Sequence, residues 1–177
     1  MYSILSLVDN PVDSEIQKIF NTILPITSNN PPIIWQYPHF TWHSAGGFDS
    51  TLIESELSTL ANRINSFSMR VTGIGVFTGT TRILFLPILK TTDLVNLQNM
   101  IYSSTQKISI DPSEFYTSEK WIPHITLLSS SDDQQYISPA IQELSKLNID
   151  FEIQINNISF GQYTGNEAKI FQKHNLQ

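Results

Sequence analysis

Hydrophobic and polar positions follow two different periods along the chain, and together they predict a mixture of helices and strands. Apolar residues three and four positions apart at 16–24, at 53–64 and at 94–101 are typical of helices with one buried face. A fourth helix is expected to end near Leu147, and Pro139 suits its first turn because a helix leaves the N–H groups of that turn unpaired.

The strands are predicted from apolar runs and from strict alternation. Residues 149–155 alternate apolar and polar side chains, which is the clearest two-residue period in the sequence. Gly46-Gly47 is expected to end an earlier strand, and residues 109–118 are expected to be irregular. Further strands are predicted at 2–8, 33–43, 69–77, 82–89, 121–128, 158–163 and 168–174.

One short motif occurs twice. Proline, histidine and threonine recur at the same offsets in 38–42 (Pro-His-Phe-Thr-Trp) and in 123–127 (Pro-His-Ile-Thr-Leu). In a strand, residues two apart point to the same face, so each copy offers one imidazole and one hydroxyl to a common surface. These groups are His39 with Thr41 and His124 with Thr126.

The spacing of the two copies predicts a duplicated fold. The histidines lie 124 − 39 = 85 positions apart, close to half of the 177 residues, and each motif strand is followed by a polar loop, a helix and a strand pair. We expect an α+β fold in which two antiparallel sheets with flanking helices surround a central cleft. Its two lobes, related by a pseudo-two-fold axis, would form a single domain over residues 1–177.

The composition of the chain indicates which kinds of ligand it can be expected to bind. The formal net charge is −6 and the ten Lys and Arg residues are scattered, whereas a protein that tracks long nucleic acid carries a basic stripe. A small nucleotide or an RNA terminus is the expected ligand. The absence of cysteine excludes disulfides and thiol catalysis. With no basic leader and no apolar run of spanning length, we expect a cytoplasmic monomer that does not bind membranes.

Two imidazoles facing one cleft suit the in-line opening of a cyclic phosphodiester. One histidine removes a proton from water while the other protonates the leaving oxygen, and an ordinary pKa near 6.5 makes both states accessible at neutral pH. The threonine hydroxyls can donate to phosphate oxygens, where negative charge accumulates. This chemistry requires no metal and no cofactor, and the sequence shows no carboxylate cluster that would hold a metal ion.

Three further residues are candidates for the substrate pocket, each with a simpler alternative. His43 shares a strand face with His39 if the strand continues, but it is otherwise an ordinary strand-end histidine. Arg82 follows a predicted hairpin turn, from which it could reach a phosphate or simply be exposed. Tyr163 is a possible base-stacking residue, although aromatic residues in strands usually belong to the core. By alternation, Trp42 is expected in the core.

The paired His-Phe-Thr-Trp and His-Ile-Thr-Leu motifs resemble the signatures of the two-histidine phosphoesterase superfamily, which includes 2′-5′ RNA ligases and RNA cyclic phosphodiesterases. This resemblance implies a bilobal α+β fold, metal-independent cleavage of 2′,3′-cyclic phosphates, possible reversal as 2′-5′ ligation, and an active set made of the two histidines and two threonines. Two alternatives remain open at this point. One is a nuclease of cyclic oligonucleotide signals, of the kind phages use against host defence, and the other is a nucleotide-binding module without turnover.

Overall fold

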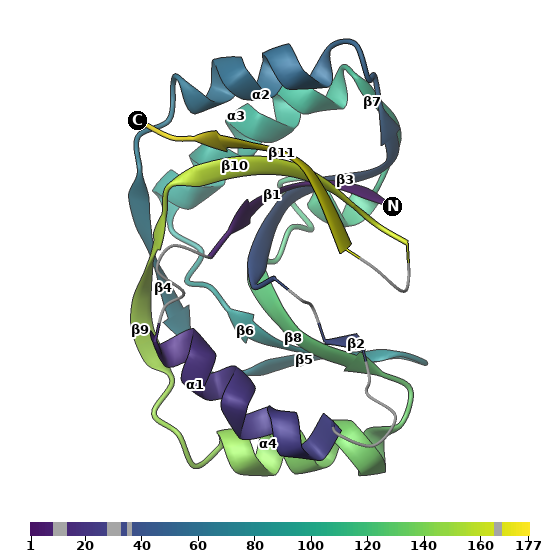
Figure 1. Ribbon diagram of the computed structural model, residues 1–177, viewed down its shortest axis with the longest axis vertical. Coiled ribbons are helices and arrows are strands. Elements are labelled where there is room, and N and C mark those ends of the chain that lie inside the picture. Colours follow the sequence, from purple (N-terminus) through teal and green to yellow (C-terminus); the bar gives the residue numbers. More distant parts are fainter. Residues whose placement is uncertain (9–13, 28–32, 35–36, 165–167) are drawn as a thin grey trace.

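The computed structural model describes the chain except for residues 9–13, 28–32, 35–36 and 165–167. It confirms a mixed α+β fold in which the same order of elements, strand–helix–motif strand–helix–strand–strand, occurs twice (Figure 1). The first unit comprises β1 (Tyr2–Leu7), α1 (Ser14–Ile23), β3 (His39–Phe48), α2 (Ile53–Ala61), β4 (Phe67–Thr72) and β5 (Gly75–Phe77). The second comprises β6 (Arg82–Pro87), α3 (Thr92–Gln106), β8 (His124–Ser130), α4 (Ser138–Leu144), β9 (Asp150–Ile155) and β10 (Asn157–Tyr163).

Shorter elements complete the description. Each motif strand is preceded by a short strand that pairs with the other motif strand: β2 (Ile33–Ile34) pairs with β8, and β7 (Ser109–Pro112) pairs with β3. The remaining elements are 3-10 helices at Leu24–Thr27 and Glu114–Tyr116, a π-helical turn at Asp133–Ile137, and β11 (Ala168–Asn175), which extends the sheet beyond β10.

The strands form two sheets. The larger one runs in the order β11-β10-β1-β3-β8-β6-β5, with the two motif strands adjacent at its centre, and the smaller one is the pair β4-β9. Each pairing among the described strands is antiparallel. The larger sheet is therefore shared between the lobes, and it continues from one lobe into the other through β3 and β8.

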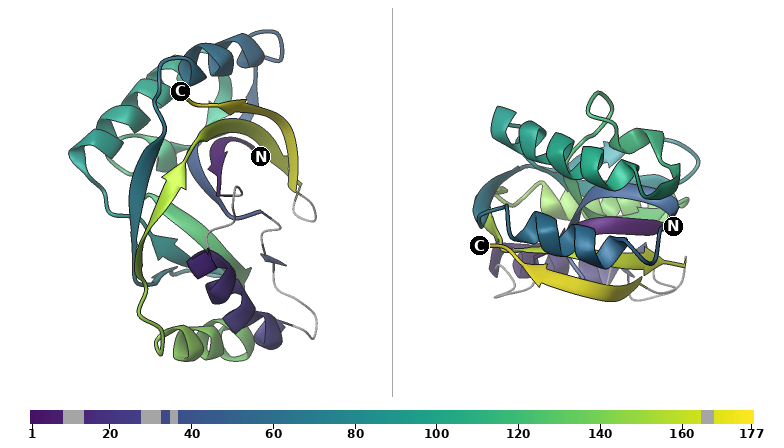
Figure 2. Two further views of the ribbon diagram at one scale, coloured as in Figure 1. Left: turned by 60° about the vertical axis from the view of Figure 1, so that its left-hand side comes forward. Right: turned by 90° about the horizontal axis from the view of Figure 1, so that it is seen from above.

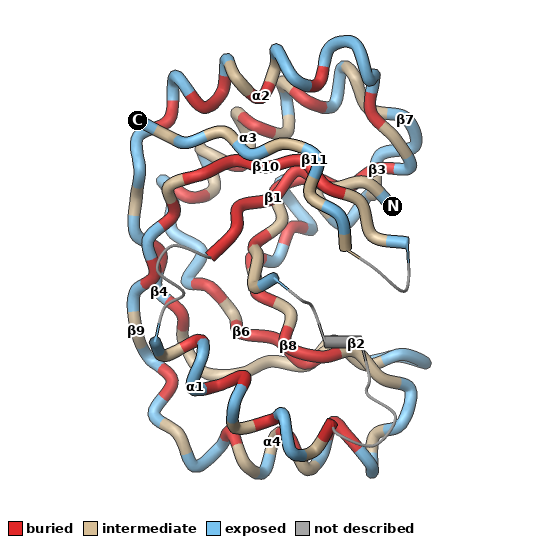
Figure 3. Tube along the Cα trace, viewed as in Figure 1, coloured by how far each residue is buried: buried red, intermediate tan, exposed pale blue. Residues whose placement is uncertain are grey.

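Helices cover the two ends of the molecule. Helices α2 and α3 pack together at one end and α1 packs on α4 at the other (Figure 1). The left view in Figure 2 shows β4 and β9 running side by side between these two helix pairs. Buried positions lie along the strands and on the inner helix faces, and the outer helix faces are exposed (Figure 3). In α1 the buried set is Ile16, Ile19, Phe20 and Ile23, as predicted. Leu24, the last residue of the predicted face, lies beyond α1 and is exposed.

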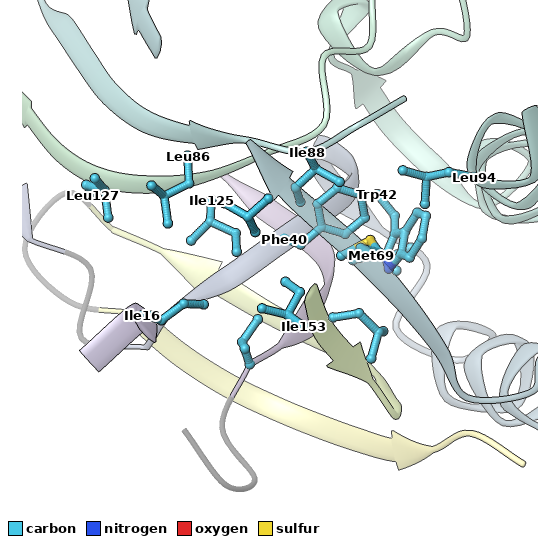
Figure 4. Close-up of a cluster of buried hydrophobic side chains, with 14 of the residues drawn as sticks. Ile16, Phe40, Trp42, Met69, Leu86, Ile88, Leu94, Ile125, Leu127 and Ile153 are labelled. Carbon is cyan, nitrogen blue, oxygen red and sulfur yellow. The ribbon is translucent and has the colours of Figure 1, made fainter. Parts of the chain in front are cut away.

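The core joins the motif strands to the smaller sheet. Phe40 and Trp42 from β3 and Ile125 from β8 gather near Met69 and Ile153 of the β4–β9 pair (Figure 4). The ring of Phe40 meets that of Trp42 edge-on, with 4.5 Å between centroids. The core position predicted for Trp42 is confirmed, because its side chain is 1% exposed. Packing on this face fixes the opposite face of β3 and β8, where the motif histidines and threonines lie.

Two of the predicted strands have different bounds in the structure, and glycines lie at both places. The prediction that Gly46-Gly47 ends the first motif strand is wrong, since β3 continues to Phe48. Pairing of Gly47 with Ile110 on β7 supplies backbone hydrogen bonds, so 109–118 is not wholly irregular. By contrast, the predicted strand 69–77 divides at Gly73, whose φ of +70° favours glycine. Residues 35–36 of the predicted strand 33–43 lie outside the described part of the chain.

Candidate active site

The motif strands meet at one residue pair. Phe40 on β3 pairs with Ile125 on β8, and each residue directly follows a motif histidine. In an antiparallel pair, the neighbours of this position are His39 opposite Thr126 and Thr41 opposite His124. All four side chains line one cavity of about 290 Å³, close to the lower end of the volumes typical of ligand pockets. The structure therefore brings the predicted histidines and threonines together.

Both histidine rings make the same local hydrogen bond, from Nδ1 to the backbone carbonyl two residues earlier. Nδ1 of His39 lies 2.9 Å from the carbonyl oxygen of Tyr37, and Nδ1 of His124 lies 2.6 Å from that of Ile122. A carbonyl only accepts hydrogen bonds, so Nδ1 carries the proton in both rings and Nε2 is the nitrogen that takes up or releases a proton. The proline before each histidine restricts the backbone of the residue that supplies this carbonyl.

Each motif proline also ties its strand to a neighbour. The carbonyl of Pro38 accepts a hydrogen bond from the N–H of Val8 at 2.9 Å, and that of Pro123 accepts one from Ile88 at 3.1 Å. Val8 follows β1 and Ile88 follows β6, so the two contacts occupy equivalent places in the duplicated fold. The repeated proline is therefore part of the positioning of each histidine.

Burial is the main cause of the shifted pKa values of the two histidines. Burial lowers the pKa of His39 below its ordinary 6.5, the Tyr37 carbonyl opposes the change, and the nearby His124 lowers this pKa further. Burial also lowers the pKa of His124, against the opposing effect of the Ile122 carbonyl. Both imidazoles are therefore more acidic than free histidine, which favours proton donation to a leaving oxygen.

The surroundings of the two histidines differ. The His124 ring meets Phe77 and Phe85 edge-on, at centroid distances of 5.0 and 5.2 Å, and these two phenylalanines stack on each other. On the side of His39, the register places Leu7 of β1 beside the histidine. Phe77 and Phe85 thus pack against the His124 ring. Neither phenylalanine is part of the described wall of the cavity.

A β-bulge follows the threonine in both motif strands. Leu5 pairs with Thr41 but Ile4 pairs with His43, so Trp42 has no partner in the register. In the second copy, Phe85 pairs with Thr126 but Leu84 pairs with Leu128, and Leu127 is skipped in the same way. An extra residue reverses the alternation beyond it. The fifth residue after each histidine, Ser44 or Ser129, consequently lines the cavity.

The bulge also corrects the expectation for His43. This residue does not lie on the face of His39 and Thr41; it is fully buried on the opposite side, against α3. Its Nδ1 lies 2.8 Å from the Thr105 hydroxyl, and its ring packs on Tyr102 and Phe48. Burial lowers the pKa of His43 to about 4. His43 is therefore a histidine of the core, and it is not at a strand end either, because β3 continues to Phe48.

The other two predicted pocket residues have different positions. Tyr163 lines the cavity from β10, and partial burial raises the pKa of its phenol. Arg82 does not line the described wall of the cavity. Its Nε lies 3.5 Å from Oδ1 of Asp133, in an ion pair at the start of β6.

Tyr116 is a cavity residue that the sequence did not indicate. Its phenol lies within hydrogen-bonding reach of the Ser44 and Thr41 hydroxyls, which oppose the rise that burial causes in its pKa. Buried Gln98 holds it in place by donating to the Tyr116 carbonyl at 2.7 Å. The hydroxyl of Ser44 is also 2.7 Å from that of Ser3. A run of hydroxyl groups thus connects Ser3 to Thr41.

No described group of three or more His, Asp or Glu side chains has the arrangement of a metal site. Within the same described residues, no helix is long and apolar enough to cross a membrane.

Known proteins share the sequence pattern and the fold of this chain. The sequence model of the 2′-5′ RNA ligase superfamily matches residues 30–167. No curated protein sequence matches the chain. Among solved structures, TT0787 of Thermus thermophilus has a TM-score of 0.66 and 14% identity, with 99% of this chain and 97% of that chain covered.

Two further structures show the same fold. E. coli LigT, solved with phosphate, has a TM-score of 0.56 and 17% identity, with 99% of this chain and 96% of LigT covered. Usb1 of Kluyveromyces marxianus has a TM-score of 0.53 and 12% identity, with coverages of 99% and 97%. Because the family model spans most of the chain and the paired motifs meet in one cavity, the protein belongs to the 2′-5′ RNA ligase superfamily of two-histidine phosphoesterases.

Proposed function

We propose that the protein is a metal-independent phosphodiesterase that opens 2′,3′-cyclic phosphates, with His39 and His124 as general acid and base. The observation that carries the proposal is the matched pair of imidazoles, each with Nδ1 bound to a backbone carbonyl and both lining one cavity. This arrangement leaves two equivalent Nε2 atoms for proton transfer, as an in-line displacement requires.

The reaction balances with these groups alone. One Nε2 takes a proton from water as the water oxygen bonds to phosphorus, and the bond from phosphorus to one ribose oxygen breaks. The protonated Nε2 of the other histidine gives its proton to that oxygen, leaving a phosphomonoester and a free ribose hydroxyl. Thr41 and Thr126 donate to the phosphate oxygens that carry the developing charge. With an RNA 5′-hydroxyl in place of water, the same groups would form a 2′-5′ linkage.

The relatives support a nucleotide as ligand. LigT has been solved with 3′-AMP and Usb1 with uridine monophosphate. Here we propose a small cyclic nucleotide or an RNA terminus, bound by a single two-lobed domain acting as a cytoplasmic monomer.

The test is turnover of 2′,3′-cyclic AMP in the presence of EDTA. His39→Ala and His124→Ala should each lower kcat by roughly a hundred- to ten-thousand-fold, because each removes a positioned acid or base. His174→Ala, on β11 and outside the described cavity lining, is the matched histidine control and should keep the wild-type rate.

Three results would contradict the proposal. Activity that disappears in EDTA would contradict the metal-independent mechanism. Nucleotides that raise the melting temperature without any turnover would instead support a binding module. Much faster cleavage of cyclic oligonucleotides than of 2′,3′-cyclic AMP would favour the signal-degrading nuclease.

A further inference from the structure

The two motif strands share little backbone pairing with each other. Among the described residues their register contains the single pair Phe40–Ile125, whereas β3 forms six pairs with β1 and β8 forms six with β6. Each motif strand is therefore fixed mainly within its own lobe. The placement of one motif relative to the other depends also on side chains that cross between the lobes.

Trp121 makes such a crossing. It lies three positions before His124, in the segment that leads into β8, yet its indole Nε1 donates to the backbone carbonyl of Thr41 at 3.1 Å. Trp121 is 2% exposed, stacks on Trp42 at a centroid distance of 6.0 Å and meets the ring of Phe40 edge-on at 5.5 Å. One side chain of the second motif segment thus binds the main chain of the first motif.

The main chain of Trp121 is itself held in the second lobe. Its N–H donates to the carbonyl of Thr117 at 2.8 Å, and its carbonyl accepts from Nζ of Lys90 at 2.9 Å. The same Nζ lies 5.8 Å from the centroid of the indole ring. The indole is therefore fixed at both ends, by its own backbone in the second lobe and by the Thr41 carbonyl in the first.

The Thr41 carbonyl belongs to the peptide at which the bulge of β3 begins. Thr41 pairs with Leu5, and the next residue, Trp42, has no partner in the register. A bulge disrupts the ladder locally, so the peptide there is held less firmly by strand pairing. The indole N–H supplies a donor at this point, and it restrains the residue whose hydroxyl faces the cavity.

We propose that Trp121 is a positioning residue whose indole N–H fixes the Thr41 peptide and so aims the Thr41 hydroxyl at the phosphate. This rests on the proposed function, in which that hydroxyl donates to the phosphate oxygens. Trp121 is not part of the described wall of the cavity, so it acts on the reaction through Thr41. Because the donor is most important where charge develops, the effect belongs to kcat more than to KM.

The test removes the indole N–H and keeps the shape of the ring. Benzothienylalanine, in which sulfur replaces the N–H, is incorporated in place of Trp121 by nonsense suppression. With 2′,3′-cyclic AMP, kcat should fall roughly tenfold, as expected for the loss of one buried hydrogen bond, and KM should change by less than about twofold.

The matched control is the same replacement of Trp42. Its Nε1 donates to Oγ of Ser6 at 2.8 Å, and its side chain is 1% exposed in the same aromatic stack. This replacement removes an equally buried hydrogen bond that does not involve Thr41, so it should keep the wild-type kcat.

A double-mutant cycle separates the positioning of Thr41 from a general loss of packing. In Thr41→Val the hydroxyl is absent, so the replacement of Trp121 should cause little further loss of kcat. In Thr126→Val, which removes the hydroxyl on β8, the same replacement should still lower kcat roughly tenfold.

Three kinetic outcomes would overturn the proposal: an unchanged kcat after the replacement of Trp121, an equal loss of kcat after the replacement of Trp42, or equal losses in the Thr41→Val and Thr126→Val backgrounds. The NMR signals of the threonine methyl groups give a readout independent of turnover. Replacing Trp121 should shift the Thr41 methyl signal more than the Thr126 signal, and equal shifts would contradict the proposal. If the wild type hydrolyses no cyclic phosphate, the proposed function fails, yet the methyl shifts still support or overturn the positioning of Thr41.

Discussion

Phe40 on β3 and Ile125 on β8 form the register pair that joins the two motif strands, and both side chains are fully buried. Each is the first residue after a motif histidine, so the pseudo-two-fold axis passes between them. Packing on the core side of this pair therefore fixes the groups on its other side, with His39 opposite Thr126 and Thr41 opposite His124. The symmetry of the site follows from one cross-strand contact.

This symmetry predicts similar contributions from the two threonines. Thr41→Val and Thr126→Val should each lower kcat by roughly a hundredfold or more, the usual effect of removing a donor to a developing oxyanion. Thr→Ser at either position keeps the hydroxyl and should retain most of the activity. Single-turnover rates with 2′,3′-cyclic AMP provide the measurement. A large effect at one threonine and none at the other would show that only one hydroxyl contacts the phosphate.

The serines after the bulges predict a difference between the two halves. Ser44 is connected to Ser3 and Tyr116, whereas the register pairs Ser129 with the apolar Ile83 of β6. Tyr116→Phe removes one hydroxyl that orients Thr41 and should lower kcat about fivefold, with little change in KM. Tyr102→Phe, against His43, is the matched control. An unchanged kcat in Tyr116→Phe would mean that the hydroxyl run has no role in orienting Thr41.

The lowered pKa values of the two histidines predict that enzymatic activity has its optimum at acidic pH. One histidine must be neutral and the other protonated, and the protonated form is lost as the pH rises through a pKa that lies below 6.5. The maximum of kcat/KM should therefore lie below pH 6.5. A bound phosphodiester anion favours the imidazolium, so the kcat profile should shift toward higher pH. An optimum of kcat/KM at pH 8 would contradict the proposed burial effect.

Much of this arrangement could be predicted because the motif occurs twice. The repetition identified both histidines, both threonines and the duplicated fold without any knowledge of long-range pairing. The bulges could not be predicted in this way, since they depend on which residues of β1 and β6 oppose the motif strands. Simple alternation placed His43 in the pocket, whereas the bulge turns it into the core.

The same bulges explain why two cavity serines were missed. Ser44 and Ser129 stand at the same offset after the two histidines, so the sequence repeat extends to Pro-His-x-Thr-x-x-Ser. In a regular strand, a residue five positions after the histidine faces away from it. Simple alternation would therefore assign the repeated serine to the opposite face of the sheet and not to the cavity. Tyr116 had no comparable signal, because its position depends on a 3-10 turn held by Gln98 of α3.

The burial of His43 predicts that the folded state loses stability in acid, independently of any effect on catalysis. Because the Thr105 hydroxyl donates to the Ile101 carbonyl at 2.8 Å, it accepts from Nδ1 of His43, and Nε2 is the buried nitrogen without a partner among the described residues. Protonating Nε2 would bury a charge and an unpaired N–H, which accounts for the pKa of about 4.

The folded pKa of His43 lies below its ordinary 6.5, so the unfolded chain takes up this proton first as the pH falls. The stabilising effect is complete above pH 6.5 and should be lost between pH 6.5 and 4, at a total cost of about 3 kcal/mol. Urea unfolding of His43→Asn, which retains a donor for Thr105, should show a weaker pH dependence over this range. His174→Asn should follow the wild type. Equal slopes for wild type and His43→Asn would show that His43 does not titrate on unfolding.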